Sequence, residues 1–515
     1  MAGFYEYQLL LLTGVCIAVL LFERYVASAK KPPATARKDT GELEDTLENG
    51  QAAGIAPAVG NGVTGARGPA LQALMQKYLI VYAIVMGADW LQGPYVYSLY
   101  RQQYAFSERI VAVLFVTGFV SAGLFAPLVG VWADQYGRRR LCLLFCITYT
   151  LTCALLLFPY LPLLFLGRVL GGISTSILFS AFESWLVSAS TSAALQSEDL
   201  SSIMGRATLV NGFVATGAGI FSNKLVEWNA EGFRSPFIAS GCLLTLAWFV
   251  IRGTWTENYG GAGAPSADTD IFQIKRLGSA WGIVTADPVL LVLGLTQTIF
   301  EGSMYLFVFI WVPTLQESSP DASALPLGYI FSAFMVSMML GSLLYTFVTA
   351  HWSRPRAHPA TCRLRVHRVH RQHHRRRERF TTDPPREALL ARTGAGGNPW
   401  AEHLKFWAFC AFEACVGMYY PVQGMLRGSL IANEHRATVS ALFRVPLNVF
   451  VVFSLLTGVS SARNLVLTAC AIVLAISSIT TAAVIIPRIE APPDHPHRQS
   501  RFPKNTIPDP THTDH

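Results

Sequence analysis

Residues 130–140 read GVWADQYGRRR and form a short polar turn between two apolar stretches. These stretches, near 110–133 and 141–159, have about the 17 to 25 residues that a helix needs to cross a bilayer. Three consecutive arginines follow Gly137, and loops rich in Arg and Lys mark the cytosolic side of a membrane. This part of the sequence therefore predicts two membrane-spanning helices that are joined on the cytosolic side.

Apolar stretches of this length recur along the whole chain. Hydrophobic residues make up 52% of the 515 residues and charged residues only 14%, whereas soluble domains carry about 25% charged residues. The predicted spans lie near 5–24, 78–100, 110–133, 141–159, 163–190, 206–226, 235–252, 288–312, 327–350, 402–424, 439–460 and 464–487. These twelve stretches predict an all-α polytopic membrane protein.

The first apolar stretch has two interpretations, a cleaved signal peptide or an uncleaved anchor. No basic residue precedes it and Glu6 stands before its core, whereas Arg24 and Lys30 follow the core. Because positive charge stays on the cytosolic side, this order predicts an uncleaved anchor whose N-terminus lies outside.

The composition divides the chain into eight parts. They are an anchor helix at 1–28, a disordered cytosolic linker at 29–77, a six-helix bundle at 78–252, a cytosolic linker at 253–287, the first part of a second bundle at 288–350, a basic segment at 351–399, the remainder of the second bundle at 400–487 and a disordered tail at 488–515. The linkers and the tail have mixed charge and many small residues or prolines, which disfavour a packed core.

An internal repeat supports two bundles. Ala-Phe-Glu ends at Glu183 and again at Glu413, and Arg-Ala-Thr begins at Arg206 and again at Arg436. Both pairs are offset by 230 residues. Repeated halves are common in membrane transporters. The chain therefore predicts two half-bundles of six helices, preceded by one anchor helix.

The basic segment occupies the place where the repeat requires the ninth helix of the two bundles. Residues 354–380 hold ten Arg and five His against one Glu, and no Lys. Each Arg at the centre of a membrane helix costs about 2.5–3.5 kcal/mol on insertion scales, so this stretch cannot span a bilayer. The ninth core helix is therefore missing or mistranslated.

Three interpretations of the basic segment are open: a solvated cytosolic loop, a patch that binds nucleic acid or acidic lipid, and coding sequence read in the wrong frame. We favour the wrong frame, because GC-rich DNA read out of frame yields Arg- and Pro-rich sequence without Lys. Without a ninth helix, Arg427 and Arg436 would also end up outside, against the charge rule.

Several motifs resemble known families. GVWADQYGRR resembles the loop G-x-x-x-D-x-x-G-R-[RK] of the major facilitator superfamily, and GRVLGG at 167–172 resembles its fourth-helix motif. The strings ADWLQGPYVYSLY, TENYG, FVFIWVP, PLGYIFSAFM and FRVPL are similar to the eukaryotic molybdate-anion transporter family. The resemblance covers roughly 75 to 350 and 400 to 487.

The resemblance implies a secondary active transporter that takes up molybdate at the cell membrane by alternating access between two bundles. In the turn that resembles the superfamily loop, it implies gating roles for Gly130, Asp134, Gly137, Arg138 and Arg139. Two alternatives stay open: a carrier of another anion or small organic acid, and a non-transporting membrane receptor of the same fold.

Two arginines within the apolar spans are candidates for binding the oxyanion. Molybdate is a tetrahedral dianion, and the guanidinium group offers a planar fork of N–H donors for oxyanion oxygens. Arg168 and Arg444 are therefore candidate substrate ligands. Gln92, Gln297 and Tyr305 share helix faces with nearby carboxylates and are candidate lining residues.

Four carboxylates also lie within apolar spans, where ionisable residues mark a substrate or proton path by default. They are Asp89, Glu183, Glu301 and Glu413. A carboxylate cannot ligate an anion, but in low dielectric it favours its protonated form. These residues are therefore candidate proton carriers or partners of an arginine, and the alternative is that buried pairs only hold helices together.

Other classes of function lack a signal. The sequence contains no Ser/His/Asp arrangement, no cluster of metal ligands and no nucleotide-binding glycine motif, so we expect no enzyme, metal or cofactor. The net charge of +8 fits basic cytosolic loops. The expected partners are molybdate and the lipid bilayer, and not nucleic acid.

Overall fold

The computed structural model describes residues 2–29, 63–228, 231–259, 274–319, 325–352, 399–431, 436–456 and 463–490. Its long helices are α1 (Ala2–Ala29), α2 (Val63–Gln92), α4 (Glu108–Tyr136), α5 (Arg138–Leu156), α6 (Leu161–Leu178), α7 (Ala181–Ser192), α8 (Ser197–Trp228), α9 (Ser235–Thr254), α10 (Ile274–Ala286), α11 (Pro288–Gln316), α12 (Leu327–Trp352), α15 (Pro399–Leu430), α16 (Arg436–Leu456) and α17 (Arg463–Glu490). Short helical turns are α3 (Val96–Ser98), the π-helix η2 (Leu99–Gln103) and the 3-10 helix η3 (Gly232–Arg234).

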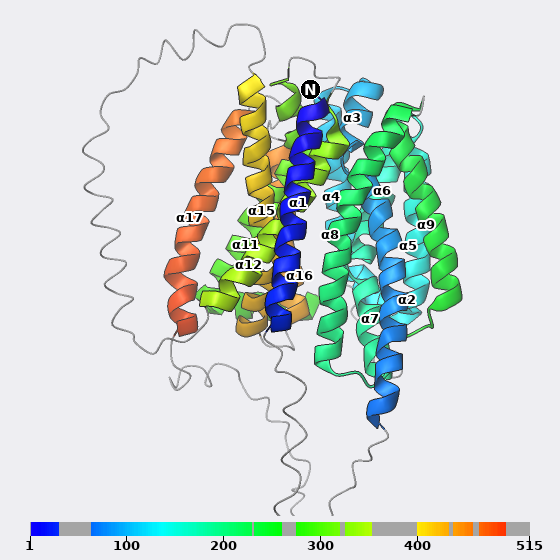
Figure 1. The fold of residues 1–515 in the computed structure, drawn as a ribbon, viewed down its shortest axis with the longest axis vertical. Coiled ribbons are helices and arrows are strands. Elements are labelled where there is room, and N and C mark those ends of the chain that lie inside the picture. The colour runs from blue at the N-terminus through cyan, green and yellow to red at the C-terminus, as the bar shows by residue number, and fades with distance from the viewer. Residues whose placement is uncertain are drawn as a thin grey trace, which may run out of the picture.

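The helices run side by side in two bundles (Figure 1). In the first bundle, α2 packs against α8 and α9, and α4 packs against α6. In the second, α11 packs against α16 and α17, and α12 packs against α15. A helix lies at every one of the twelve predicted spans, so the predicted all-α fold is confirmed.

The helices at the predicted spans differ in how apolar they are. Within the described ranges, nine helical stretches are long and apolar enough to cross a membrane. The helices α8, α15 and α16 are not among them. Their polar residues are spread through otherwise apolar sequence. Packing against neighbouring helices must therefore contribute to their stability in the membrane.

The two bundles meet through α8 on α12 and α4 on α16. One cluster of buried residues runs across this interface and contains Tyr97, Phe115, Phe309 and Phe334. Tyr97 and Phe115 each contact Phe309 edge to face, with ring centroids 5.7 Å and 5.3 Å apart. Helix α1 lies beside α12 in the second bundle. The end of the bundles at which α1 begins, predicted to be extracellular, is called the outer end below.

The course of α12 and α15 bears on the missing ninth helix. The two helices run parallel, because Phe334 contacts Phe406 near their starts and the Tyr345 hydroxyl contacts the Met425 sulfur farther along. Helix α12 has 26 residues, or about 39 Å at 1.5 Å per residue. The end of α12 and the start of α15 therefore lie at opposite ends of the bundle.

Several helix boundaries differ from the predictions, most clearly at three places. Helix α2 begins at Val63, so that residues 63–77 are helical although the linker prediction covered them. Leu71, Leu74 and Met75 pack against the core of the first bundle, which explains why this part is ordered as helix. Helix α10 likewise lies within the predicted linker 253–287.

The third difference divides the predicted span 163–190 into α6 and α7. The backbone of Phe179 and Ser180 leaves the helical region, with φ/ψ of −82°/0° and −122°/−58°. Glu183 therefore falls in the first turn of α7, a new helix. The predicted segments 30–62, 353–398 and 491–515 lie outside the described residues.

Candidate functional site

A hydrogen-bonded chain surrounds Glu301 near the middle of α11. The Tyr419 hydroxyl donates to Glu301 Oε1 at 3.2 Å, and Gln423 Nε2 donates to the Tyr419 hydroxyl at 3.1 Å. The buried side chain of Gln297, one turn before Glu301, lies within electrostatic reach of this carboxylate. The chain joins α11 to α15, and it includes Tyr419 and Gln423, which the sequence did not single out.

Two guanidinium groups lie within electrostatic reach of the same carboxylate. They belong to Arg427 on α15 and Arg444 on α16. Arg444 is exposed, and its positive charge also lies within electrostatic reach of Tyr305, one turn after Glu301. The Tyr305 ring contacts Phe119 of the first bundle, with centroids 5.1 Å apart. The structure thus brings together four predicted residues, Arg444, Gln297, Tyr305 and Glu301, on the side of the second bundle that faces the first.

This arrangement carries excess positive charge. Among the residues that the structure describes around it, Arg427 and Arg444 stand against the carboxylate of Glu301. The exposed fork of Arg444 therefore has donors to offer to a further anion. In the sequence, Arg427 bore only on the topology, because it lies beyond the predicted span 402–424, near the end of α15.

Two predicted residues on α2 contact the first bundle instead. The Tyr149 hydroxyl donates to Asp89 Oδ1 at 2.6 Å. Gln92 Nε2 donates to Ser240 Oγ at 2.8 Å and to the Ala88 carbonyl at 3.3 Å. Tyr149 lies on α5 and Ser240 on α9. Asp89 and Gln92 are therefore not part of the group of Arg444, Gln297, Tyr305 and Glu301, which is called the Arg444 cluster.

Arg168 on α6 is also engaged within the first bundle. Its Nε donates to the Leu114 carbonyl at 3.1 Å, and its guanidinium lies over the Phe115 ring, 5.1 Å from the centroid. The guanidinium also lies within electrostatic reach of the buried Tyr100 side chain. A Cβ on Gly118 would lie 2.7 Å from Arg168 Nη2, so this glycine makes room for the guanidinium. These contacts hold α4 and α6 together, as in the packing alternative.

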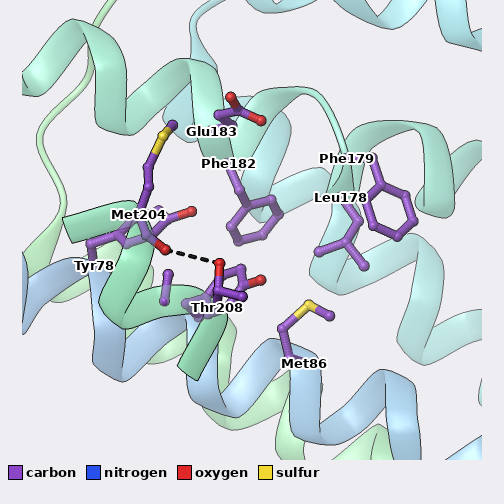
Figure 2. Close-up of a pocket in the computed structure, with 10 residues that line it drawn as sticks. Tyr78, Met86, Leu178, Phe179, Phe182, Glu183, Met204 and Thr208 are labelled. Carbon is purple, nitrogen blue, oxygen red and sulfur yellow. Dashed lines mark hydrogen bonds between the residues drawn. The ribbon is translucent and has the colours of Figure 1, made fainter. Parts of the chain in front are cut away.

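The fourth-helix glutamates of the two repeats have different surroundings. Glu183 lines a cavity of about 230 Å³ between α2, the α6–α7 junction and α8 (Figure 2). The residues that line the cavity are Tyr78, Tyr82, Met86, Leu178, Phe179, Phe182, Glu183, Met204, Ala207 and Thr208. Glu413 is instead buried on α15, near Cys410 and Tyr420.

The predicted gating turn forms the junction of α4 and α5. Arg138 Nη1 donates to the Ser184 carbonyl on α7 at 3.1 Å, and Arg139 Nη2 donates to the Arg252 carbonyl at 2.6 Å. A Cβ on Gly130 would meet no atom within 4 Å. The contacts that the structure shows for these arginines stay within the first bundle. The side chain of Asp134 lies outside the described part of the structure.

Glu257 completes this turn and was not predicted as a site residue. Its Oε1 accepts from the Arg139 amide at 2.8 Å and its Oε2 from the Arg140 amide at 3.1 Å. It thereby caps the first turn of α5, where backbone N–H groups lack partners and favour negative charge. Gly137 has φ +102°, and a Cβ there would lie 2.6 Å from the Glu257 carboxylate. The string TENYG, which contains Glu257, was the available signal.

Comparisons with known proteins agree with this architecture. The profile of a family described as sugar transporters with 12 transmembrane segments matches residues 57–360. A Danio rerio protein named molybdate-anion transporter is 34% identical over 415 residues, which cover 76% of this chain and 81% of that protein. A Xenopus laevis protein of the same name is 33% identical over 422 residues, which cover 81% of this chain and 84% of that protein.

Solved transporters share the fold at low sequence identity. The nucleoside transporter NupG matches with a TM-score of 0.53 and 10% identity over 81% of this chain and 100% of that chain. An auto-inhibited peptide transporter of the POT family matches with a TM-score of 0.55 and 12% identity over 82% of this chain and 98% of that chain. At these identities the similarity concerns the fold alone.

Proposed function

The chain belongs to the molybdate-anion transporter family of the major facilitator superfamily, and on this basis we propose that it carries molybdate across the cell membrane as a secondary active transporter. The observation that carries the proposal is the Arg444 cluster at the face between the bundles. There, two guanidinium groups stand near one carboxylate, and one of them is exposed.

The chemistry of this cluster suits a tetrahedral oxyanion. Molybdate must exchange its hydration for N–H donors and positive charge, and Arg444 can provide two parallel donors. Arg427 adds positive charge, while Tyr419 holds the Glu301 carboxylate in place. When no anion is bound, the Glu301 carboxylate partly neutralises the two guanidinium groups. The remaining positive charge attracts an anion without holding it so strongly that it cannot leave.

The packing of the bundles supports alternating access as the mechanism. At the outer end, the Asn223 side-chain oxygen accepts from the Tyr95 hydroxyl at 3.0 Å and from the Gly328 amide at 3.2 Å. Nearby, Ser332 Oγ donates to the Thr216 carbonyl at 2.8 Å. These contacts hold α8 against α12 on the outer side. A carrier closed there would load or release its cargo on the cytosolic side, and rocking of the bundles would reverse this.

Proton coupling is proposed for Asp89 and Glu301. The hydrogen-bond partner of Asp89 is the neutral Tyr149 hydroxyl, which does not cancel its charge. Glu301 has both a neutral partner, Tyr419, and two cationic neighbours. Taking up a proton is one way to neutralise a carboxylate in a low-dielectric span. We therefore expect the two carboxylates to differ in how readily they take up a proton, because only Glu301 has cationic neighbours.

The test is uptake of labelled molybdate by cells that lack their own carrier and express this chain. We expect uptake above that of cells with an empty vector, and we expect excess unlabelled molybdate to compete more strongly than sulfate. Uptake equal to the empty-vector cells would contradict the proposal. Equal competition by sulfate would leave a carrier of oxyanions without selectivity for molybdate.

A further inference from the structure

We propose that the cavity beside Glu183 binds a small organic cation, a substituted ammonium, at a place separate from the Arg444 cluster. This cavity is called the tyrosine cavity and is lined by the ten residues given above, from Tyr78 to Thr208. Cation binding there does not depend on molybdate being the cargo of the second bundle.

The tyrosine cavity lies within the first bundle, away from the outer end. One of its walls is α8, which also packs against α12. Thr208 stands 15 residues before Asn223 on α8, about 22 Å along the helix. Since Asn223 belongs to the outer contacts, the cavity lies in the half of the first bundle that faces the cytosolic side.

The walls of the cavity consist largely of aromatic rings and polarizable methionine thioethers. Tyr78 and Tyr82 are one helical turn apart on α2, with ring centroids at 5.5 Å and planes 22° apart. Phe182 and Met86 enter from opposite walls (Figure 2). Aromatic faces carry negative charge density that attracts cations, and rings grouped in this way recognise quaternary ammonium ligands.

Glu183 gives the cavity one negative charge without compensation. None of the ten lining residues is basic. In the ranges that the structure describes, Glu183 forms no ion pair. Two nearby arginines have other partners, because Arg138 donates to the Ser184 carbonyl and Arg206 Nη1 contacts the Met75 sulfur at 3.0 Å. A cationic ligand would supply the missing charge.

The same features disfavour other ligands. An oxyanion would meet a carboxylate and ring faces with no positive group among the lining side chains. A hard metal ion requires about six oxygen ligands, whereas most of this wall is ring and thioether. The volume of about 230 Å³ far exceeds the ~10–15 Å³ that one water needs, so a ligand of several heavy atoms has room.

Choline is a suitable probe, and 3,3-dimethylbutan-1-ol is its uncharged counterpart of the same shape. Binding of labelled choline would be measured on the full chain in lipid nanodiscs, with each compound as competitor. We expect saturable choline binding that choline displaces and the alcohol does not. Both Glu183→Gln and Tyr82→Leu should weaken binding about tenfold, because they remove the charge and the ring face.

Two further variants separate recognition from misfolding. Tyr82→Phe keeps the ring and should bind choline within about twofold of the parent chain. Glu231→Gln removes an exposed carboxylate that pairs with Arg234 after the end of α8, and it should not change binding. Displacement by the uncharged alcohol as effective as by choline would overturn the proposal, as would unchanged binding in Glu183→Gln.

Molybdate uptake by the same parent chain distinguishes this proposal from the proposed function. Choline binding without molybdate uptake would refute the transport proposal and leave the cation site standing. Molybdate uptake without choline binding would refute the cation site and leave the transport proposal standing.

Discussion

Carboxylates that look alike in the sequence have different neighbours in the folded chain. Asp89 accepts a hydrogen bond from Tyr149, Glu301 lies between a tyrosine and two arginines, and Glu183 lines a cavity. Each lies in a predicted apolar span, so hydropathy ranks them together. Their chemistry depends on which helices supply the neighbours, and a single helix of the sequence does not reveal that.

Arg444→Lys should lose most molybdate uptake, by about tenfold or more, although the protein reaches the membrane. The ammonium group of lysine cannot provide the planar pair of donors that the guanidinium offers to an oxyanion. Uptake would be measured at equal surface expression. Arg252→Lys is the control, because Arg252 lies over Trp248 at the end of α9, outside the cluster. Near-parent uptake in Arg444→Lys would exclude the oxyanion role.

Asp89→Asn and Glu301→Gln should differ in the pH dependence of uptake. If proton coupling operates, uptake by the parent chain rises as the external pH falls. Asp89→Asn should flatten this slope, because the partner of Asp89 is a neutral hydroxyl. Glu301→Gln should lower uptake at every pH and reduce the slope less than Asp89→Asn does, because Glu301 also balances the charge of Arg427 and Arg444. Uptake by the parent that does not vary with pH would rule out coupling through either residue.

At the scale of helices, the turn between α4 and α5 combines a strained glycine with a cap from a distant segment. Glu257 lies beyond the end of α9, about 120 residues after the turn that it caps, and caps of this kind stabilise a helix by ~1 kcal/mol. The motif in the turn was recognisable in the sequence. The sequence did not identify Glu257 as the cap, because local patterns contain no information on which distant carboxylate reaches the start of a helix.

Gly137→Ala should lower the free energy of unfolding by about 1–3 kcal/mol, because φ is +102° and the new Cβ would lie 2.6 Å from the Glu257 carboxylate. Gly130→Ala is the matched control from the same motif. Its Cβ would meet no atom within 4 Å, and alanine favours a helix, so stability should stay equal or rise slightly. Thermal unfolding of the purified variants would decide, and equal stability of the two variants would contradict the strained role of Gly137.

At the scale of the whole molecule, the outer contact depends on close approach of α8 and α12. A Cβ on Gly328 would lie 2.3 Å from the Gly219 carbonyl oxygen. Because both are backbone positions within helices, a side chain there would push the bundles apart. Small residues allow such approach between membrane helices.

Gly328→Ala should therefore weaken closure at the outer end. We expect lower uptake, together with faster labelling of Tyr305→Cys by a membrane-impermeant thiol reagent from outside. Gly217→Ala on α8 is the control, because its Cβ would meet no atom within 4 Å. Labelling that is unchanged in Gly328→Ala would show that this contact does not close the pathway.

The position of the basic segment also belongs to this scale. Trp352 and Pro399 stand at opposite ends of the second bundle, so the chain between them has to pass from one end to the other. We expect the transcript to show another frame or splice across this stretch, one that encodes about 20 mostly apolar residues. Sequencing of the transcript is the measurement. A transcript in the present frame, together with full transport activity, would contradict the expectation.

The sequence by itself determined the helical membrane fold, because apolar runs of bilayer length have few other stable structures in lipid. It also determined the repeat and the turn between α4 and α5, which local motifs identify. Only the tertiary structure decided that Arg444, Gln297, Tyr305 and Glu301 gather while Arg168 and Gln92 serve the first bundle. It alone decided the partnership of Glu257 with α5 and the cavity beside Glu183. The reason is that these features arise where helices far apart in the sequence pack together, and helix periodicity specifies a face but not the neighbour that the face meets.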